Sequence, residues 1–254
     1  MVDLHCHIIP CIDDGPGNLN DCLIMANRAV SAGITHIFAT PHHLNGQYEN
    51  SKWIILKYVD ELNEYFKDEG IPITVLPGQE IRIHREFFHS LKTDELLTLA
   101  NAGKYILIEL PFLDIPSYTH EIIYELLLKG ITPIIAHPER NRKFIEDSRL
   151  LVELVQEGAL TQLTAGSIIG RFGKKVRTFA ETMIEHNLAH FIASDAHNVT
   201  TRGFFLNEAY DKITKSYGVS QMFYFRENAQ LLLNGQSIQR EEPIPIRKKI
   251  FRLF

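Results

Sequence analysis

The sequence predicts an α/β fold made of βαβ units, in the manner of a (β/α) barrel. Seven short apolar runs recur along the chain, and each is followed by a longer amphipathic stretch. Runs rich in β-branched and aliphatic residues suit strands that are buried on both faces, as in a parallel sheet covered by helices. The seven runs lie at residues 2–8, 35–43, 73–81, 104–111, 132–139, 159–166 and 189–197.

The amphipathic stretches carry the start and stop signals of helices. Three of them cover residues 18–33, 52–70 and 117–130, and each ends at a glycine. Asn18 and Ser117 are the expected N-caps. The second stretch has apolar residues at broadly helical spacings. These are Trp53, Ile54, Leu56, Tyr58, Leu62, Tyr65 and Phe66.

Length and composition favour one domain with one sizeable core. The chain has 254 residues, 45% of them hydrophobic, and α/β barrels of about this length commonly form one domain. We expect that domain to span residues 1–254. Its basic and apolar C-terminal tail, residues 241–254, should dock on the barrel or fray, with contact to an acidic partner or an anionic membrane surface as a second interpretation.

Charge and cysteine content argue against several classes of protein. A net charge of −5 gives no basic surface of the kind that nucleic-acid binders carry. Cys6, Cys11 and Cys22 are odd in number and clustered, which argues against a disulfide framework. No stretch reads as a secretion signal or reaches bilayer length, so we expect a cytoplasmic protein.

Side chains that can bind metal ions lie at the carboxyl ends of the apolar runs or one or two residues beyond. In a (β/α) barrel these ends converge on one rim, where active sites are found. We therefore expect the side chains to meet there. They are His42, Glu80, Glu109, His137, Asp195 and His197.

The first run adds two histidines that are separated by one residue. Apolar Leu4, Cys6 and Ile8 alternate with His5 and His7. Alternation by two places both imidazoles on the same face of a short strand, where they could hold one ion together. Taken alone, the pair could equally be two partly exposed histidines on an edge strand.

Two adjacent aspartates, Asp13 and Asp14, follow the first run and precede Gly15. Aspartate favours such turns because its side chain makes local hydrogen bonds. One of the two can be a metal ligand and the other a turn former, and the sequence leaves this choice open. We include Asp14 in the ligand set.

Two glutamates lie in apolar surroundings, Glu80 in "PGQE" and Glu109 in "LIELP". A carboxylate buried without a partner costs several kcal/mol, so a cation is the simplest partner for both. For Glu109, an ion pair with a nearby lysine or arginine is the alternative.

The complete set contains five imidazoles and four carboxylates, too many for one tetrahedral zinc ion. Mixed nitrogen and oxygen ligands suit Mn²⁺, Fe²⁺ or Zn²⁺. Two or three neighbouring ions can supply a hydroxide and stabilise both oxygens of an in-line displacement, which predicts hydrolysis of a phosphate ester. The set is His5, His7, Asp14, His42, Glu80, Glu109, His137, Asp195 and His197.

Phosphate chemistry also needs cations for the oxygens that do not react. Arg140, three residues after His137, and Arg202, five after His197, lie on the same rim loops. A planar guanidinium can donate two parallel hydrogen bonds to phosphate, so both are candidate catalytic residues. The rim histidine His42 is a further candidate catalytic residue, although no general acid is assigned.

The motifs together resemble the PHP (polymerase and histidinol phosphatase) superfamily. More closely, the chain resembles the manganese-dependent bacterial protein-tyrosine phosphatases of the CpsB and YwqE type over essentially its whole length. The matching motifs are HxH at 5–7, the aspartate at 14, the histidine at 42, "GQE" at 78–80, "IEL" at 108–110, "HPER" at 137–140 and "SDAHN" at 194–198.

This resemblance implies a distorted seven-stranded (β/α) barrel with three metal ions, expected to be Mn²⁺. His43 or Asp13 could substitute as a ligand. The resemblance assigns the three ions as follows: His5, His7, Glu80 and Asp195 to the first, Glu80, Glu109 and His137 to the second, and Asp14, His42 and His197 to the third.

The resemblance also implies a substrate: phosphotyrosine in a protein, typically the tail of a partner tyrosine kinase linked to polysaccharide synthesis. Phenol, with a pKa of about 10, leaves more easily than a serine alkoxide, so we expect metals and arginines to suffice without a strong general acid. The main alternative is a small-molecule phosphatase of the histidinol phosphate type. A metal-dependent binding module without turnover is a third interpretation.

A second tyrosine-phosphatase signature is present but is rejected. Residues 22–28 read "CLIMANR", which fits the C-x5-R pattern of cysteine-dependent enzymes. The stretch has no glycine and lies within an expected helix, so it offers no loop of free N–H groups for phosphate. We expect Cys22 to be a small buried hydrophobic residue.

Overall fold

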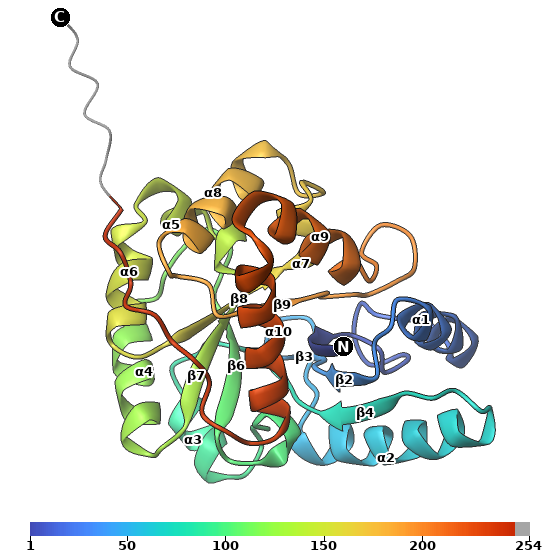
Figure 1. Cartoon of the computed structure of the whole chain (residues 1–254). Coiled ribbons are helices and arrows are strands. Elements are labelled where there is room, and N and C mark those ends of the chain that lie inside the picture. The colour runs from blue at the N-terminus through green and yellow to red at the C-terminus, as the bar shows by residue number, and fades with distance from the viewer. Residues whose placement is uncertain (247–254) are drawn as a thin grey trace, which may run out of the picture.

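The computed structural model describes residues 1–246, so most of the basic tail, residues 247–254, lies outside the described residues. The chain is an α/β fold in which all strand pairs are parallel (Figure 1). Its strands are β1 (Val2–Cys6), β2 (His36–Ala39), β3 (His42–His43), β4 (Thr74–Pro77), β5 (Glu80–Arg82), β6 (Tyr105–Glu109), β7 (Thr132–Ala136), β8 (Leu160–Thr164) and β9 (Phe191–Ala193).

Helices follow most strands and cover the outside of the sheets (Figure 1). The α-helices are α1 (Leu19–Ser31), α2 (Lys52–Asp68), α3 (Phe87–Lys92), α4 (Thr119–Leu128), α5 (Arg142–Glu146), α6 (Arg149–Gln156), α7 (Ala165–Ile168), α8 (Lys174–Glu185), α9 (Leu206–Tyr217) and α10 (Val219–Leu233). Two 3-10 helices, η1 (Leu99–Asn101) and η2 (Pro138–Arg140), complete the described elements.

All seven predicted apolar runs contain strands, in two parallel sheets. One sheet has the order β1-β2-β4 and the other the order β3-β5-β6-β7-β8-β9. Two runs are each divided by two residues outside a strand, so that one run contains β2 and β3 and the other contains β4 and β5. A bridge from Cys6 to Ala196 links β1 to the segment after β9. The strands therefore follow a barrel-like order, but their pairing is interrupted rather than closed into one continuous ladder.

The pairing of β1 is irregular close to the two N-terminal histidines. The pairing of β1 with β2 shifts between Asp3 and Cys6. As a result, Leu4 packs in one core cluster and Cys6 in the other, although the residues are two positions apart. The predicted alternation is wrong only for Leu4, because Cys6 and Ile8 share the larger cluster while His5 and His7 belong to one candidate ligand group. β-Bulges commonly redirect side chains next to active sites in this way.

The apolar core has two parts. The larger cluster joins strands to helices, and the smaller one is lined by alternate strand residues such as Leu107 of β6 and Ala193 of β9. Leu232 of α10 closes the smaller cluster, and α10 crosses in front of the strands in Figure 1. Glu109 follows Leu107 by two residues, and Asp195 follows Ala193 by two. These candidate ligands therefore lie next to the smaller cluster, nearer the carboxyl ends of the strands.

The predicted helices are present, with two corrections. Asn18 caps α1 as expected, because its side chain accepts a hydrogen bond of 2.9 Å from the backbone N–H of Asp21. Ser117 is not the cap of α4, whose N-cap Tyr118 makes no side-chain capping bond. In α2 the predicted apolar residues Leu62 and Phe66 are buried, but Trp53 is 62% exposed, and Ile55 and Val59 complete the buried stripe.

The described part of the C-terminal tail docks on the body of the protein. The backbone N–H of Ile244 donates to the carbonyl oxygen of His186 at 2.9 Å, and Ile246 packs against the larger core cluster. Among the described residues, no helix is both long and apolar enough to span a bilayer.

A buried histidine outside the candidate site makes stability depend on pH. His190 is 1% exposed, and its Nδ1 accepts a hydrogen bond of 3.1 Å from the backbone N–H of Thr161. Burial, and then the charge of Arg240, lower the pKa of His190 to about 3. Between about pH 6.5 and 3, the unfolded chain therefore binds up to one more proton than the native chain.

We expect acid to destabilise the protein through this group by about 1.4 kcal/mol per unit of pH between about 6 and 3. His190→Gln, which keeps an acceptor for Thr161, should make the pH dependence shallower by that amount. Urea unfolding of chelated protein at several pH values measures this, with surface His36→Gln as the control. Equal slopes for His190→Gln and the wild type would contradict the prediction.

Candidate metal centre

The nine predicted ligands converge in one region of the structure. Eight of them are buried, and the side chain of Asp14, which is 42% exposed, marks the side on which the centre opens to solvent. In each of three groups, the ligand atoms lie within 4.8 Å of one another. The groups are His5, His7 and Glu80; His42, Glu80 and Glu109; and His7, Asp14, His42 and His197.

Glu80 belongs to two of these groups and contacts His42, which is a member of the third. Its Oε2 lies 2.8 Å from Nδ1 of His42 and 3.3 Å from Nε2 of His5, and its Oε1 lies 2.7 Å from Nε2 of His137. The pairing of β3 with β5 places His42 directly beside Glu80. Although burial alone would raise its pKa, the neighbouring His5 and His42 hold the pKa of Glu80 well below its ordinary value.

Glu109 lies at the end of β6, paired in register with Arg82 of β5. Its Oε2 is 2.9 Å from Nη2 of Arg82 and 3.9 Å from Nδ1 of His42. Burial, and then the charge of Glu80, raise the pKa of Glu109 to about 7. The structure therefore agrees with both interpretations of Glu109: the carboxylate forms an ion pair with Arg82, and it also belongs to a candidate group of metal ligands.

Asp13 and Asp14 have different surroundings. Oδ2 of Asp13 lies 2.6 Å from Nδ1 of His7, and its Oδ1 accepts a hydrogen bond of 2.9 Å from the backbone N–H of Gly15. Oδ1 of Asp14 lies 3.2 Å from Nε2 of His197. Carboxylates that hold the far nitrogen of a metal-binding histidine fix its orientation. The geometry thus favours Asp14 as the ligand and Asp13 as the residue that orients His7.

Gln162 of β8 has the corresponding role for His5. Its Oε1 lies 2.8 Å from Nδ1 of His5, so Nε2 of this imidazole is directed toward Glu80 and Asp195. Sequence analysis identified neither Gln162 nor Arg82. For Arg82 the sequence did contain a signal, because Arg82 follows Glu80 by two residues and both side chains therefore lie on the same face of the strand.

Two candidate ligands have left-handed backbone conformations directly after their strands. The φ angles are 34° at His137, after β7, and 52° at Asp195, after β9. Residues other than glycine rarely adopt this conformation, and such strain is often found at functional sites. Here the conformation turns each side chain into the centre.

Both predicted arginines contact the carboxylate of Asp195. Nη2 of Arg140 bonds Oδ2 of Asp195 and donates to Oγ1 of Thr164 at 3.1 Å. Nη2 of Arg202 donates to Oδ1 of Asp195 at 3.1 Å, and its Nη1 donates to Oδ2 of Asp14 at 3.3 Å. The two guanidinium groups therefore lie beside the candidate ligands, as the phosphate role requires.

His43 lies apart from the three groups. Its neighbour in register is Ile81, and neither of its ring nitrogens has a hydrogen-bond partner among residues 1–246. Burial lowers the pKa of His43 to about 4. Adjacent strand residues point to opposite faces, so His43 faces away from the groups that include His42.

The donor set fits divalent cations. Four buried side-chain atoms of the groups, His42 Nδ1, Glu80 Oε2, Glu109 Oε2 and His197 Nε2, make no hydrogen bond within the described part of the chain. Their neighbours at 2.8 to 3.2 Å are ion-pair contacts without hydrogen-bond geometry, so a cation between these atoms would compensate the cost of burying them. Imidazole nitrogens and carboxylate oxygens together suit Mn²⁺, Fe²⁺ or Zn²⁺.

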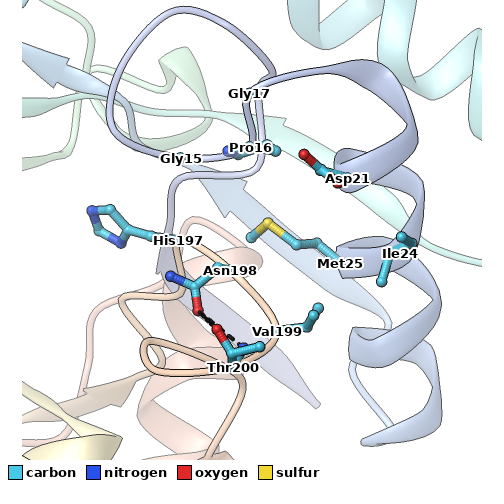
Figure 2. A pocket seen from close by; sticks show the side chains of 10 residues that line it. All are labelled: Gly15, Pro16, Gly17, Asp21, Ile24, Met25, His197, Asn198, Val199 and Thr200. Atoms are coloured by element: carbon cyan, nitrogen blue, oxygen red, sulfur yellow. Dashed lines mark hydrogen bonds between the residues drawn. The ribbon is translucent and has the colours of Figure 1, made fainter.

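A pocket of about 270 Å³ lies beside this centre (Figure 2). Residues 15–17, helix α1 and the loop after β9 form its walls, with Ile24 and Met25 on one side and His197 on the other. Asn198 holds this loop in shape, because its Oδ1 accepts a hydrogen bond of 3.0 Å from the backbone N–H of Thr200.

The rejected cysteine signature is indeed not a phosphate loop. Cys22 is fully buried in the larger core cluster, within α1, whereas Arg28 is exposed. The two side chains therefore share no site.

An α/β fold with buried groups of histidines and carboxylates defines the chain as a candidate metalloenzyme. Residues 1–234 match a family described as "Capsular polysaccharide synthesis, CpsB/CapC". The chain therefore belongs to the CpsB/CapC family, which confirms the resemblance noted in its motifs.

Named relatives span the whole chain. It is 48% identical over 255 residues to the tyrosine-protein phosphatase YwqE of Bacillus subtilis, covering 100% of both chains. It is 39% identical to a putative tyrosine-protein phosphatase CapC of Staphylococcus aureus, covering 96% of this chain and 95% of the relative.

Solved structures give the same result. The fold matches one from a study of YwqE from Bacillus subtilis and CpsB from Streptococcus pneumoniae, described as "unique metal-dependent tyrosine phosphatases". The TM-score is 0.94, with 47% identity, covering 98% of this chain and 100% of the other. A histidinol phosphate phosphatase from Lactococcus lactis shares the fold alone, with a TM-score of 0.54 and 14% identity, covering 85% and 95% of the two chains.

The different surroundings of the two aspartates predict different effects on metal binding. Asp14→Ala should lower the number of manganese ions bound at saturation by about one per chain, because a direct ligand is lost. Asp13→Asn should keep that number and weaken metal affinity about 10- to 100-fold, because only the orientation of His7 is affected. Elemental analysis and metal titration measure both quantities. The account is contradicted if Asp13→Asn is the variant that loses an ion.

Proposed function

We propose that the protein is a metal-dependent protein-tyrosine phosphatase, which hydrolyses phosphotyrosine with a metal-activated hydroxide. The main support is the convergence of nine candidate ligands and two arginines in one buried centre. The names of the relatives support the same activity.

The proposed ligand sets are those that the family resemblance implies. They overlap with the three groups of side chains, although Asp195 and His137 belong to none of those groups. His5, His7, Glu80 and Asp195 would hold one ion, Glu80, Glu109 and His137 a second, and Asp14, His42 and His197 a third. His42 lies between the second and third sets, since its Nδ1 faces Glu80 and its Nε2 lies 3.5 Å from Asp14. The bound ions would lower the pKa of a water molecule and neutralise charge on the phosphate.

The residues of the chain perform the remaining steps. Arg140 and Arg202 would bind the phosphate oxygens that do not react, exchanging part of their contact with Asp195 for the substrate. Asp13 and Gln162 keep His7 and His5 in orientations that direct their Nε2 atoms inward. The leaving phenolate needs little help from an acid, because the pKa of phenol is about 10.

The metal and the partner complete the proposal. We propose Mn²⁺ as the ion, with Fe²⁺ and Zn²⁺ as alternatives, because the mixed donor set accepts all three. The proposed substrate is a tyrosine-phosphorylated protein, with the tail of a bacterial tyrosine kinase as the first candidate. The description of the family supports a role in capsular polysaccharide synthesis. The cytoplasmic location and a membrane contact of residues 241–254 stay predictions.

The first test of this function is phosphate release from a tyrosine-phosphorylated peptide. Chelation should abolish release, and addition of Mn²⁺ should restore it more fully than addition of other ions. Histidinol phosphate serves as the competing substrate, because metals and arginines contact only the phosphate. Faster turnover of histidinol phosphate would favour a small-molecule phosphatase, and phosphate binding without release of product from either substrate would favour a binding module.

The arginine role has its own test. Arg140→Lys should lower kcat/KM for the peptide about 100-fold, because lysine cannot reproduce the planar pair of donors. Arg142→Lys is the matched control, since Arg142 is exposed and pairs with Glu146 at 2.7 Å. An Arg140→Lys enzyme as active as the Arg142→Lys enzyme would exclude Arg140 from phosphate binding.

A further inference from the structure

An exposed aromatic side chain lies at the edge of the candidate metal centre. Phe112 follows β6 in the loop that begins at Pro111, and it is 44% exposed. Its ring is stacked on the imidazole of His137, with centroids 5.8 Å apart and planes inclined by 18°. The loop is held in place, because the carbonyl oxygen of Phe112 accepts a hydrogen bond of 2.8 Å from the N–H of Arg142.

The same ring lies beside the candidate phosphate-binding arginine. Cζ of Arg140 is 5.9 Å from the ring centroid of Phe112 and 5.0 Å from that of Phe172. The guanidinium thus has an aromatic ring within cation-π distance on two sides. Phe112 therefore borders both a candidate metal ligand and the group that would bind phosphate.

The chemistry of an aryl phosphate brings its ring close to this position. A single ester oxygen separates the phosphorus atom from the phenol ring, so a phosphate bound by Arg140 holds the ring within reach of Phe112. An alkyl phosphate presents only a methylene group there. Aromatic pairs in stacked or edge-to-face geometry are more stable than burial of the same area alone.

The geometry points to Phe112 as a specificity-determining residue that contacts the phenol ring of the substrate and favours aryl over alkyl phosphates. This inference rests on the proposed function and adds to it a residue outside the ligand and arginine sets. Tyr48 is less well placed, because its ring is stacked on His42, whereas the rings found within cation-π distance of Arg140 in residues 1–246 are those of Phe112 and Phe172.

The pocket of Figure 2 is an alternative binding place for the phenol ring of the substrate. The pocket of Figure 2 adjoins His197 and has apolar walls, including Ile24, which is 46% exposed. The lining of this pocket contains no phenylalanine, tyrosine or tryptophan, and it does not include Arg140. The observations therefore favour Phe112, and a change at Ile24 can test the alternative directly.

The test compares two phosphonates that cannot be hydrolysed. Isothermal titration of manganese-loaded protein gives dissociation constants for phenylphosphonate and methylphosphonate, which differ in the ring alone. For Phe112→Ala we expect the phenylphosphonate constant to rise about 3- to 10-fold and the methylphosphonate constant to change less than about twofold. Phe112→Tyr should keep the preference, and Leu113→Ala, which alters a neighbouring side chain that is 68% exposed, is the matched control.

Other outcomes overturn the inference in distinguishable ways. An equal rise for both phosphonates would mean that Phe112 only supports Arg140. Loss of ring preference in Ile24→Ala, with none in Phe112→Ala, would place the ring in the pocket of Figure 2. If neither phosphonate binds to the wild type, the proposed function fails and the inference fails with it. If both bind the wild type and Phe112→Ala alike, the inference alone fails.

Discussion

The carboxylate of Glu80 is the feature on which the whole centre depends. It is fully buried, and it lies within 3.4 Å of imidazole nitrogens from four histidines. A buried charge is tolerated only where opposite charge or hydrogen bonds compensate it. The surrounding imidazoles partly do so here, and a shared pair of cations would complete the compensation. Removal of Glu80 would therefore take a ligand from two of the candidate groups at once, whereas the third group stays linked to them through His7 and His42.

The fold supplies this arrangement by changing the character of the enclosed face along the strands. Away from the carboxyl ends of the strands, the enclosed face is apolar and packs against α10. At the carboxyl ends the face becomes polar, as shown on β6, where Glu109 follows Leu107 by two residues. The left-handed backbone at His137 and Asp195 accompanies the inward position of two more ligands, and the register of β1 shifts close to His5. Local backbone strain thus serves to assemble ligands from distant parts of the sequence.

Sequence analysis could predict the parallel α/β architecture and the location of the ligands, because apolar runs and polar residues at their ends are local patterns. It could not predict the bulge in β1, which depends on pairing with β2, nor the choice between Asp13 and Asp14, which depends on the position of His7. Gln162 and Arg82 were missed for the same reason: each has a role only through a partner on another strand.

The most direct test of a shared cation cluster is anomalous diffraction from crystals grown with Mn²⁺, recorded on both sides of the manganese absorption edge. The account predicts two or three peaks within the space bounded by the nine candidate ligands, with Glu80 in contact with two of the ions. Peaks only at surface carboxylates, or ions that leave Glu80, Glu109 and His137 without a bond to metal, would contradict it.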